Sequence, residues 1–341
     1  MNSVSKMIAG RQAILLASAC SALLAVNAPA MAAHITTSDV DAATLTMGVA
    51  IDTAGDIAGT WYDSGFVTHG FLRTADGTLT SFDPTGSTGT NVYGVNDSQS
   101  IVGSFADGTG THGFTRTADG TVTVYDAPGS AGYTEIFAIN SDNAIAGDYF
   151  AADGNEYGFV VNKKGKFTSF AANGARDTSA TAINAKGDVA GESTDPDGTF
   201  HGFVRTAKGK LTAFDVPGGD EPFADAINAK GTVAGTSFLY PDSNSGQGYI
   251  RLPSGTTQTF QVVTGYETDE SGLNDQGVVC GDYYDATGRY YGFIRKKSGA
   301  ITTVDVGGTG STVCRAINNG GQATGYYYDS QNVGHGYLRN P

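Results

Sequence analysis

The sequence predicts an all-β repeat protein, and three observations support this prediction. A phrase of the form hydrophobic-Asn-x-x-Gly-x-x-x-Gly, or a close variant, starts at Ala50, Gly94, Ala138, Ala182, Ala226, Gly272 and Ala316. Five of the six intervals are 44 residues and one is 46. Behind each phrase comes a Gly-Phe or Gly-Tyr pair, at Gly70, Gly113, Gly158, Gly202, Gly248, Gly292 and Gly336. A regular period of this length is typical of repeat architectures.

One unit, running from Ala182 to Asp215, shows the expected secondary structure. It holds four short segments with β-branched and aromatic residues, separated by turns rich in Gly, Asp, Lys and Pro. No stretch after the N-terminal region shows sustained helical periodicity. A four-stranded antiparallel sheet of this size cannot cover its own faces, so neighbouring sheets must pack on it. We therefore predict a seven-bladed β-propeller with four-stranded antiparallel blades.

The two ends of the repeat array indicate how the predicted ring closes. The last unit stops after Gly336–Arg339 and lacks a fourth strand, whereas the segment 35–40 stands alone before the first phrase and reads like 301–306, a fourth strand. We expect the N-terminal strand to pair with the last blade and close the ring. The Asn phrase is then the innermost strand of each blade.

The first 33 residues have the features of a cleaved export signal. Lys6 and Arg11 precede an apolar run at 13–26, and Ala30-Met31-Ala32 offers small residues for a signal peptidase. We expect cleavage near Ala32, which leaves 34–341 as the propeller in a secreted or periplasmic location. Cys20 offers an alternative, lipid attachment, but the apolar run continues past it.

Charge excludes several partner classes. Without Lys6 and Arg11, 18 basic side chains face 34 acidic ones, a formal charge of −16. Such a field repels phosphate backbones and anionic lipids, so we expect no nucleic-acid partner. No other apolar run is long enough for a membrane-spanning helix. The 49 glycines fall at fixed places in the units, which favours turns over disorder.

The composite phrase of a unit resembles a known family. Asn-x-x-Gly, then His-Gly-Phe, then Thr-x-Phe-Asp-x-Pro-Gly resembles the HAF-type extracellular repeat family of bacteria, with Gly in place of the eponymous Ala. The clearest copies are His112-Gly113-Phe114, His201-Gly202-Phe203 and His335-Gly336-Tyr337. The resemblance covers nearly all of the chain after residue 33 and implies a secreted, propeller-like protein. It implies no catalytic residues.

Acidic residues that do not repeat are the candidates for catalysis. Glu135, Glu221, Asp225, Glu267 and Asp269 are expected just ahead of inner strands, near the mouth of a central channel. Glycoside cleavage needs two carboxyl groups about 5 to 10 Å apart. An enzyme would therefore use Glu135, Glu221 and Glu267, although solvated loop acids are the simpler interpretation. No serine-hydrolase elbow, zinc-protease motif, phosphate-binding loop or dinucleotide fingerprint occurs.

Aromatic residues are the second set of candidates. Clusters on the second strands, such as Trp61-Tyr62, Tyr283-Tyr284 and Tyr326 to Tyr328, place about half of their rings between blades. The others are available to stack on sugar rings or a protein partner. The candidate ligand-binding residues are Trp61, Tyr93, Phe137, Asp225, Tyr283 and Tyr327.

Metal and cofactor sites are not indicated. The four repeated histidines, His69, His112, His201 and His335, lie in different blades and cannot converge on one ion. The repeated aspartates fit turn-capping roles, and only the segments 153–156 and 195–198 approach the spacing of calcium loops. We expect no cofactor, with Ca²⁺ as the alternative.

The two cysteines after the signal region, Cys280 and Cys314, are expected on neighbouring strands of adjacent blades. An oxidising compartment permits a disulfide between them, and two buried thiols fit equally well.

These observations favour a secreted, non-catalytic binding module whose ligand is a glycan or a cell-envelope or extracellular protein. The alternatives are a propeller enzyme acting on polysaccharide, as a glycosidase or lyase, and a purely structural envelope component.

Overall fold

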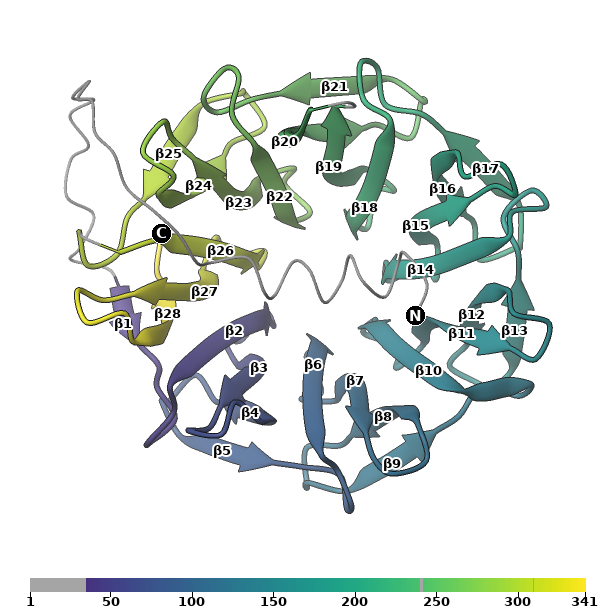
Figure 1. The fold of residues 1–341 in the computed structure, drawn as a ribbon, viewed down its shortest axis with the longest axis horizontal. Coiled ribbons are helices and arrows are strands. Elements are labelled where there is room, and N and C mark those ends of the chain that lie inside the picture. Colours follow the sequence, from purple (N-terminus) through teal and green to yellow (C-terminus); the bar gives the residue numbers. More distant parts are fainter. Residues whose placement is uncertain (1–34, 240–241, 309) are drawn as a thin grey trace.

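The computed structural model describes residues 35–239, 242–308 and 310–341, so the predicted signal region and Cys20 lie outside the described residues. In the described part the chain forms strands and turns and no helix. Hence no helix there is available to span a membrane. Figure 1 shows the strands grouped around a central axis, with one group following the next in chain order.

The strands follow the seven repeat units, which we number 1 to 7 in the order of their Asn phrases. Units 1 and 2 comprise β2 (Leu45–Ile51), β3 (Ile57–Tyr62), β4 (Thr68–Arg73), β5 (Leu79–Phe82), β6 (Gly89–Val95), β7 (Ile101–Ala106), β8 (Thr111–Arg116) and β9 (Val122–Tyr125). Units 3 and 4 comprise β10 (Ser130–Ile139), β11 (Ile145–Ala151), β12 (Glu156–Val161), β13 (Phe167–Phe170), β14 (Asp177–Ile183), β15 (Val189–Thr194), β16 (Phe200–Arg205) and β17 (Leu211–Phe214).

Units 5 and 6 comprise β18 (Glu221–Ile227), β19 (Val233–Leu239), β20 (Asp242–Arg251), β21 (Thr257–Phe260), β22 (Thr268–Leu273), β23 (Val279–Tyr284), β24 (Tyr290–Arg295) and β25 (Ile301–Val304). Unit 7 comprises β26 (Thr312–Ile317), β27 (Ala323–Tyr328) and β28 (Gly334–Arg339), and β1 (Ile35–Thr37) precedes unit 1.

Consecutive strands of a unit pair antiparallel, and the strand that carries the Asn phrase lies nearest the axis (Figure 1). Units 5 and 6 are separate four-stranded sheets. Units 2, 3 and 4 join into a 12-stranded sheet through single parallel bridges, Tyr133 to Thr111 and Glu156 to Asp177. A third bridge, Leu45 to Gly334, joins units 7 and 1. These three pairs of neighbouring units therefore touch edge to edge at the start of the inner strand.

The first described strand lies beside the last one. β1 pairs antiparallel with β28, with Ile35 opposite Arg339 and Thr37 opposite Tyr337. The Ser38 backbone N–H extends the pairing by donating to the Gly336 carbonyl at 2.8 Å. β1 thus occupies the place that a fourth strand occupies in the other units.

The repeated glycines and aromatics build the contacts between the units. The aromatic residue of each Gly-Phe or Gly-Tyr pair has essentially no exposed surface: Phe71, Phe114, Phe159, Phe203, Tyr249, Phe293 and Tyr337. The glycine that ends each Asn phrase leaves room for a carbonyl group of the inner strand, and in units 1, 2 and 4 also for this ring. A Cβ atom on Gly59 would lie 1.9 Å from the Met47 carbonyl oxygen and 2.7 Å from the Phe71 ring. Any larger residue would force β2 and β3 apart.

The Asn side chains link each unit to the next. In unit 4, Asn184 Oδ1 accepts from the Lys186 and Asp188 backbone N–H groups at 3.0 Å, which fixes the turn after the inner strand. Its Nδ2 donates to the Asn228 carbonyl of unit 5 at 3.1 Å. Equivalent inter-unit bonds of 2.8–3.1 Å run from Asn96 to Asn140, Asn140 to Asn184, Asn228 to Asn274, Asn274 to Asn318 and Asn318 to Asp52. We call this series the asparagine chain.

Unit 1 carries Asp52 in place of the asparagine. Asp52 Oδ1 accepts from the Ala54 and Asp56 backbone N–H groups, as in the other units. Its buried Oδ2 has no hydrogen-bond partner, since a carboxylate has no N–H to offer the next unit. Burial raises the pKa of Asp52, with a further contribution from the Asp56 charge. The asparagine chain is therefore interrupted between units 1 and 2.

Candidate functional site on the inner strands

Every inner strand contains a β-bulge at the same place. The register between the inner and second strands shifts around one residue per unit, and these residues are Val49, Tyr93, Phe137, Thr181, Asp225, Ser271 and Arg315. A bulge re-aims the side chain of the extra residue and is common next to functional sites. We call these seven residues the bulge positions.

The bulge positions combine a fixed backbone with varied chemistry. All seven are half-buried, whereas the residue before each is buried and the residue after each is Ala or Gly. The inner strands lie nearest the axis (Figure 1). Because neighbouring units cover both flanks of an inner strand, we infer that the exposed part of each bulge side chain lies toward the axis. Three residues predicted as ligand-binding, Tyr93, Phe137 and Asp225, fall at bulge positions.

The first two of these form an aromatic pair. The Tyr93 and Phe137 rings lie 5.1 Å apart between centroids, with planes inclined at 55°. The Tyr93 hydroxyl donates to Glu135 Oε1 at 3.1 Å. Burial, followed by the charge of Glu135, raises the pKa of Tyr93 well above its usual value, so the phenol stays a neutral donor. The two rings form an apolar surface, and the hydrogen bond to Glu135 fixes the position of Tyr93 within it.

Glu135 does not lie ahead of the inner strand, as the sequence suggested, but within β10, and Asp225 and Asp269 likewise lie within β18 and β22. The Glu135 carboxylate is 6% exposed and accepts hydrogen bonds from Tyr93, from Ser104 at 2.8 Å and from Tyr133 at 2.6 Å. A carboxylate so enclosed positions the aromatic pair and presents little surface to a substrate.

Charged bulge positions lie in units 5 and 7. The Arg315 guanidinium lies 5.8 Å from the Tyr326 ring centroid. Burial lowers the pKa of Arg315, but the neighbouring Tyr326, Asp282 and Asp269 outweigh this and raise the pKa overall. Arg315 is therefore a fixed cation, and Asp225 supplies a carboxyl group at the bulge of β18. Aromatic side chains thus occupy the bulge positions of units 2 and 3, and charged side chains occupy those of units 5 and 7.

The other two candidate catalytic glutamates begin inner-strand segments. Glu221 is the first residue of β18 and is half-buried, and burial together with the Asp220 charge raises its pKa. Glu267 directly precedes β22. Glu135, Glu221 and Glu267 belong to units 3, 5 and 6. The hydrogen bonds of Glu135 go to Tyr93, Ser104 and Tyr133, which belong to units 2 and 3.

The remaining predicted aromatics lie on second strands, away from the bulge positions. Trp61 stacks on His69 with ring centroids 4.3 Å apart, and its Nε1 donates to Ser81 Oγ at 2.8 Å. Tyr327 stacks on His335 at 5.1 Å, and Tyr283 stacks on Tyr291 at 5.6 Å. These three rings are packed against third-strand side chains of their own units.

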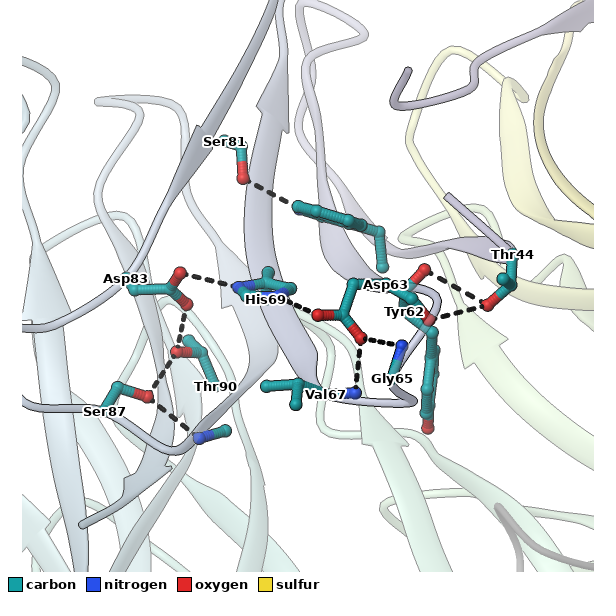
Figure 2. A network of polar contacts seen from close by, with 12 residues as sticks. Thr44, Tyr62, Asp63, Gly65, Val67, His69, Ser81, Asp83, Ser87 and Thr90 are labelled. Atoms are coloured by element: carbon teal, nitrogen blue, oxygen red, sulfur yellow. Dashed lines mark hydrogen bonds and ion pairs between the residues drawn. The ribbon is translucent and has the colours of Figure 1, made fainter. Parts of the chain in front are cut away.

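Each repeated histidine lies between two aspartates. Figure 2 shows His69 between Asp83 and Asp63. Its Nδ1 lies 2.7 Å from Asp83 Oδ2, and its Nε2 lies 3.7 Å from Asp63 Oδ2. The same arrangement holds His112 between Asp126 and Asp107, His201 between Asp215 and Asp195, and His335 between Asp39 and Asp329. Sequence reasoning missed this pairing, although the constant spacing of 14 residues between His and the following Asp carried the signal. In the last unit, Asp39 comes from the segment after β1.

A buried acid pair in unit 3 was also missed. Asp148 on β11 and Glu156 on β12 are 2% and 3% exposed and are hydrogen-bonded to each other. Burial, and then the charge of Glu135, raise the pKa of Asp148 to about 7. Ser179 donates to Asp148 Oδ2 at 2.6 Å. The available signal was an acid at the position after the second-strand glycine, which holds Asp148, Glu192 and Asp282 in units 3, 4 and 6 but Thr or Ser in units 1, 2 and 5.

Cys280 and Cys314 are buried free thiols. They lie on β23 and β26 and contact each other and Tyr337 at the boundary of units 6 and 7. Burial and the neighbouring thiol raise the pKa of Cys280. The two sulfur atoms are adjacent but unbonded in this structure.

No cluster of three or more His, Cys, Asp or Glu side chains suited to a metal ion occurs within residues 35–239, 242–308 and 310–341. The predicted calcium turns contain Asp153 and Asp197, whose carboxylates accept backbone N–H groups of Asn155 and Thr199 at 3.0 Å. They act as turn caps in this arrangement.

Comparison with known proteins places the fold. No protein-family model matches the chain, and no curated protein sequence does. Among solved structures, the chain is similar to a streptogramin B lyase (TM-score 0.59, 11% identity, covering 90% of this chain and 98% of that one). It is also similar to an inactive variant of virginiamycin B lyase from Staphylococcus aureus with quinupristin (0.59, 11%, 90% and 99%). The β-propeller domain of the Trilobed protease from Pyrococcus furiosus, described as an open velcro topology, gives 0.60, 8%, 86% and 95%.

These likenesses, together with the all-β strand content, show that the chain is an all-β protein with the β-propeller fold. At identities of 8 to 12% they establish the fold alone.

Proposed function

We propose that this chain is a secreted, HAF-type binding module, built as a propeller of seven four-stranded blades that β1 closes. The proposal on architecture is supported by the seven sequence repeats, by the antiparallel pairing within each unit and by the β1–β28 pairing. The proposal on location rests on the signal-like residues 1–33. The net negative charge disfavours nucleic acid as a partner.

The bulge positions are the proposed binding surface, and a glycan is the proposed ligand, with an envelope or extracellular protein as the second ligand class. One observation carries this proposal: the same bulge in every unit presents a side chain that is only partly buried, and the residues differ from unit to unit. Tyr93 and Phe137 supply a ring surface on which sugar C–H groups can stack. Asp225 and Arg315 supply hydrogen-bonding groups that fix orientation.

A glycan-binding titration with matched variants tests this function. Phe137→Ala removes half of the aromatic pair, and we expect the dissociation constant for a bound glycan to rise at least about tenfold. Phe66→Ala removes an exposed phenylalanine on a turn and should change glycan affinity less than about twofold. A screen of envelope glycans without saturable binding, or equal effects of the two variants, would refute the proposal.

A polysaccharide-cleaving enzyme is the second candidate, because one observation favours it. Glu221 is half-buried and has a raised pKa, as a general acid requires. Cleavage of a polysaccharide by the wild-type protein, lost in both Glu221→Gln and Glu267→Gln, would establish this function. Absence of cleavage across the glycans that bind would eliminate it.

A further inference from the structure

The turn between β3 and β4 displays a phenylalanine in a strained conformation. Phe66 is 77% exposed and has a φ of 61°, in the left-handed region that bulky residues avoid. The equivalent turn position in other units holds Gly154, Gly198, Gly288 and Asn332, which tolerate this conformation. Unit 1 therefore carries an unfavourable residue where the fold offers a favourable one.

Contacts inside the protein do not explain Phe66. The described residues include five other non-glycine residues with positive φ: Ala42, Gln99, Asn143, Asn173 and Asn332. Of these, Gln99 gains a hydrogen bond of 2.7 Å to Asp56, and Asn143 accepts one of 2.7 Å from Asn96. The Phe66 ring gains no comparable burial. Strain that the fold itself does not repay is an indication of function.

The turn is braced so that the ring is held outward. Asp63 Oδ1 accepts from the Gly65 N–H at 2.7 Å and from the Val67 N–H at 2.9 Å (Figure 2). Thr44 Oγ1 donates toward the carbonyls of Tyr62 and Asp63 at 3.2 Å. A rigid turn loses little conformational entropy when its apolar tip binds.

Val67 enlarges the apolar tip. In the described part of the chain, the exposed large hydrophobic residues are Phe66, Val67, Val124 and Ile301. Phe66 and Val67 are adjacent, whereas Val124 and Ile301 lie singly on outer strands of units 2 and 6. The only apolar surface of more than one residue in this set is therefore on the braced turn.

Charge indicates the kind of partner. The chain has a formal charge of −14, and the Asp63 carboxylate lies at the base of the turn. Two copies of this chain would repel each other, whereas a basic surface would be attracted. We propose that Phe66 and Val67 form a docking tip that inserts into an apolar pocket, rimmed by Lys and Arg, on a partner protein. This proposal does not rest on glycan binding, because the tip lies on a turn and not at the bulge positions.

Melting temperatures test the premise that Phe66 is unfavourable at its turn position. Phe66→Gly and Phe66→Asn place favourable residues at the turn, so both should raise the melting temperature by about 2 °C. A lower melting temperature in both variants would mean that Phe66 serves the fold and would overturn the proposal.

Binding is tested by photo-crosslinking followed by titration. A photoreactive phenylalanine analogue is placed at position 66, or at position 124 as an equally apolar control, and exposed to envelope proteins. We expect position 66 alone to give a defined protein adduct. The adduct protein, purified, should bind Phe66→Gly at least about tenfold more weakly than wild type, and Val124→Gly within about twofold. Affinity should fall as salt rises.

Three results would overturn the proposal: equal crosslinking at the two positions, an unchanged affinity of Phe66→Gly, or an adduct with a second copy of this chain. If Phe66→Gly loses only polysaccharide binding while Phe137→Ala retains it, the tip belongs to a glycan site and the protein-docking proposal fails. Loss of glycan binding in Phe137→Ala, with binding of the partner protein unchanged, would support two independent sites, as the two proposals require.

Discussion

The asparagine chain and the bulge positions lie on the same inner strands but follow opposite rules. The asparagine position is nearly invariant among the units, and its side chains bond unit to unit. The bulge position lies three residues earlier and changes chemistry in every unit. At both positions the backbone conformation repeats from unit to unit. Within one repeat protein, repetition therefore marks residues that hold the scaffold, and variation marks the residues that we propose as the ligand-binding set.

The largest test concerns Asp148 and Glu156, which vary between units and yet are buried. The pKa of Asp148 is raised from 3.8 to about 7, so the folded state binds an extra proton in this interval, and stability should fall as pH rises through it. We expect the free energy of unfolding to drop by on the order of 2–4 kcal/mol between pH 4 and 8. Urea unfolding across this range should show a flatter profile for Asp148→Asn than for wild type.

Asp41→Asn, at an exposed position, is the control and should leave the profile unchanged. A wild-type stability that is flat or rises toward pH 8 would show that this pair does not share a proton. Asp148 and Glu156 would then have no detectable effect on how the free energy of unfolding depends on pH.

The second test contrasts the two positions directly within unit 4. Asn184→Ala removes two turn-capping bonds and the bond to unit 5 from a buried site, and should lower the free energy of unfolding by about 2–3 kcal/mol. Thr181→Ala at the bulge removes one hydroxyl, which donates to the Ala224 carbonyl and more weakly, at 3.4 Å, to the Ala190 carbonyl, and should cost about 1 kcal/mol or less. Equal losses in chemical denaturation would abolish the distinction between scaffold and site.

The third test repairs the asparagine chain. Asp52→Asn supplies the missing N–H donor toward unit 2 and should add about 1 kcal/mol of stability at pH 7. Because the pKa of Asp52 is raised, the wild-type protein should gain part of this stability as pH falls toward 4, and the variant should not. Calorimetry at pH 5 and 7 checks both; a variant less stable than wild type at pH 7 would contradict the interpretation.

The smallest expected effect concerns the repeated His–Asp contact, which the chain makes over two very different sequence separations. His335 meets Asp39 across 296 residues, whereas His201 meets Asp215 across 14. Burial lowers the pKa of His335, but its two aspartates outweigh this and raise it overall. The contact thus stabilises fully below about pH 6.5 and is lost as pH rises through the folded pKa. Asp39→Asn should cost about 0.5–1 kcal/mol at pH 5.5 and less at pH 8.5.

Asp215→Asn is the matched variant. Because Asp39 lies directly after β1, its loss should also increase hydrogen exchange at 35–38, and Asp215→Asn should not. The same exchange at 35–38 in both variants would show that His335 does not hold the N-terminal strand.

The sequence was sufficient for most of the fold. The 44-residue period predicted the strands and their order, because each unit repeats the glycines and aromatics that packing demands, as Gly59 and Phe71 show. The resemblance of 35–40 to an outer strand predicted its partner, β28. The HAF assignment, the signal region and the secreted location remain predictions.

The candidate site was accessible only in part. Tyr93, Phe137 and Asp225 were selected from the sequence, but the bulge that unites them depends on backbone register, which residue types do not reveal. Glu135 was misplaced for the same reason. The sequence also did not predict the conformation of Phe66, because bulky residues avoid the left-handed region. This conformation is seen only when the φ angles of equivalent turns are compared.

The pairing of β1 with β28 has a consequence for biosynthesis. The segment 35–37 leaves the ribosome some 300 residues before its hydrogen-bonding partner at 337–339. The early strand must therefore stay unpaired while these residues are translated, so that its docking follows the synthesis of all seven units. A translation arrest shortly before Gly334 would leave both this edge and its complement open to aggregation.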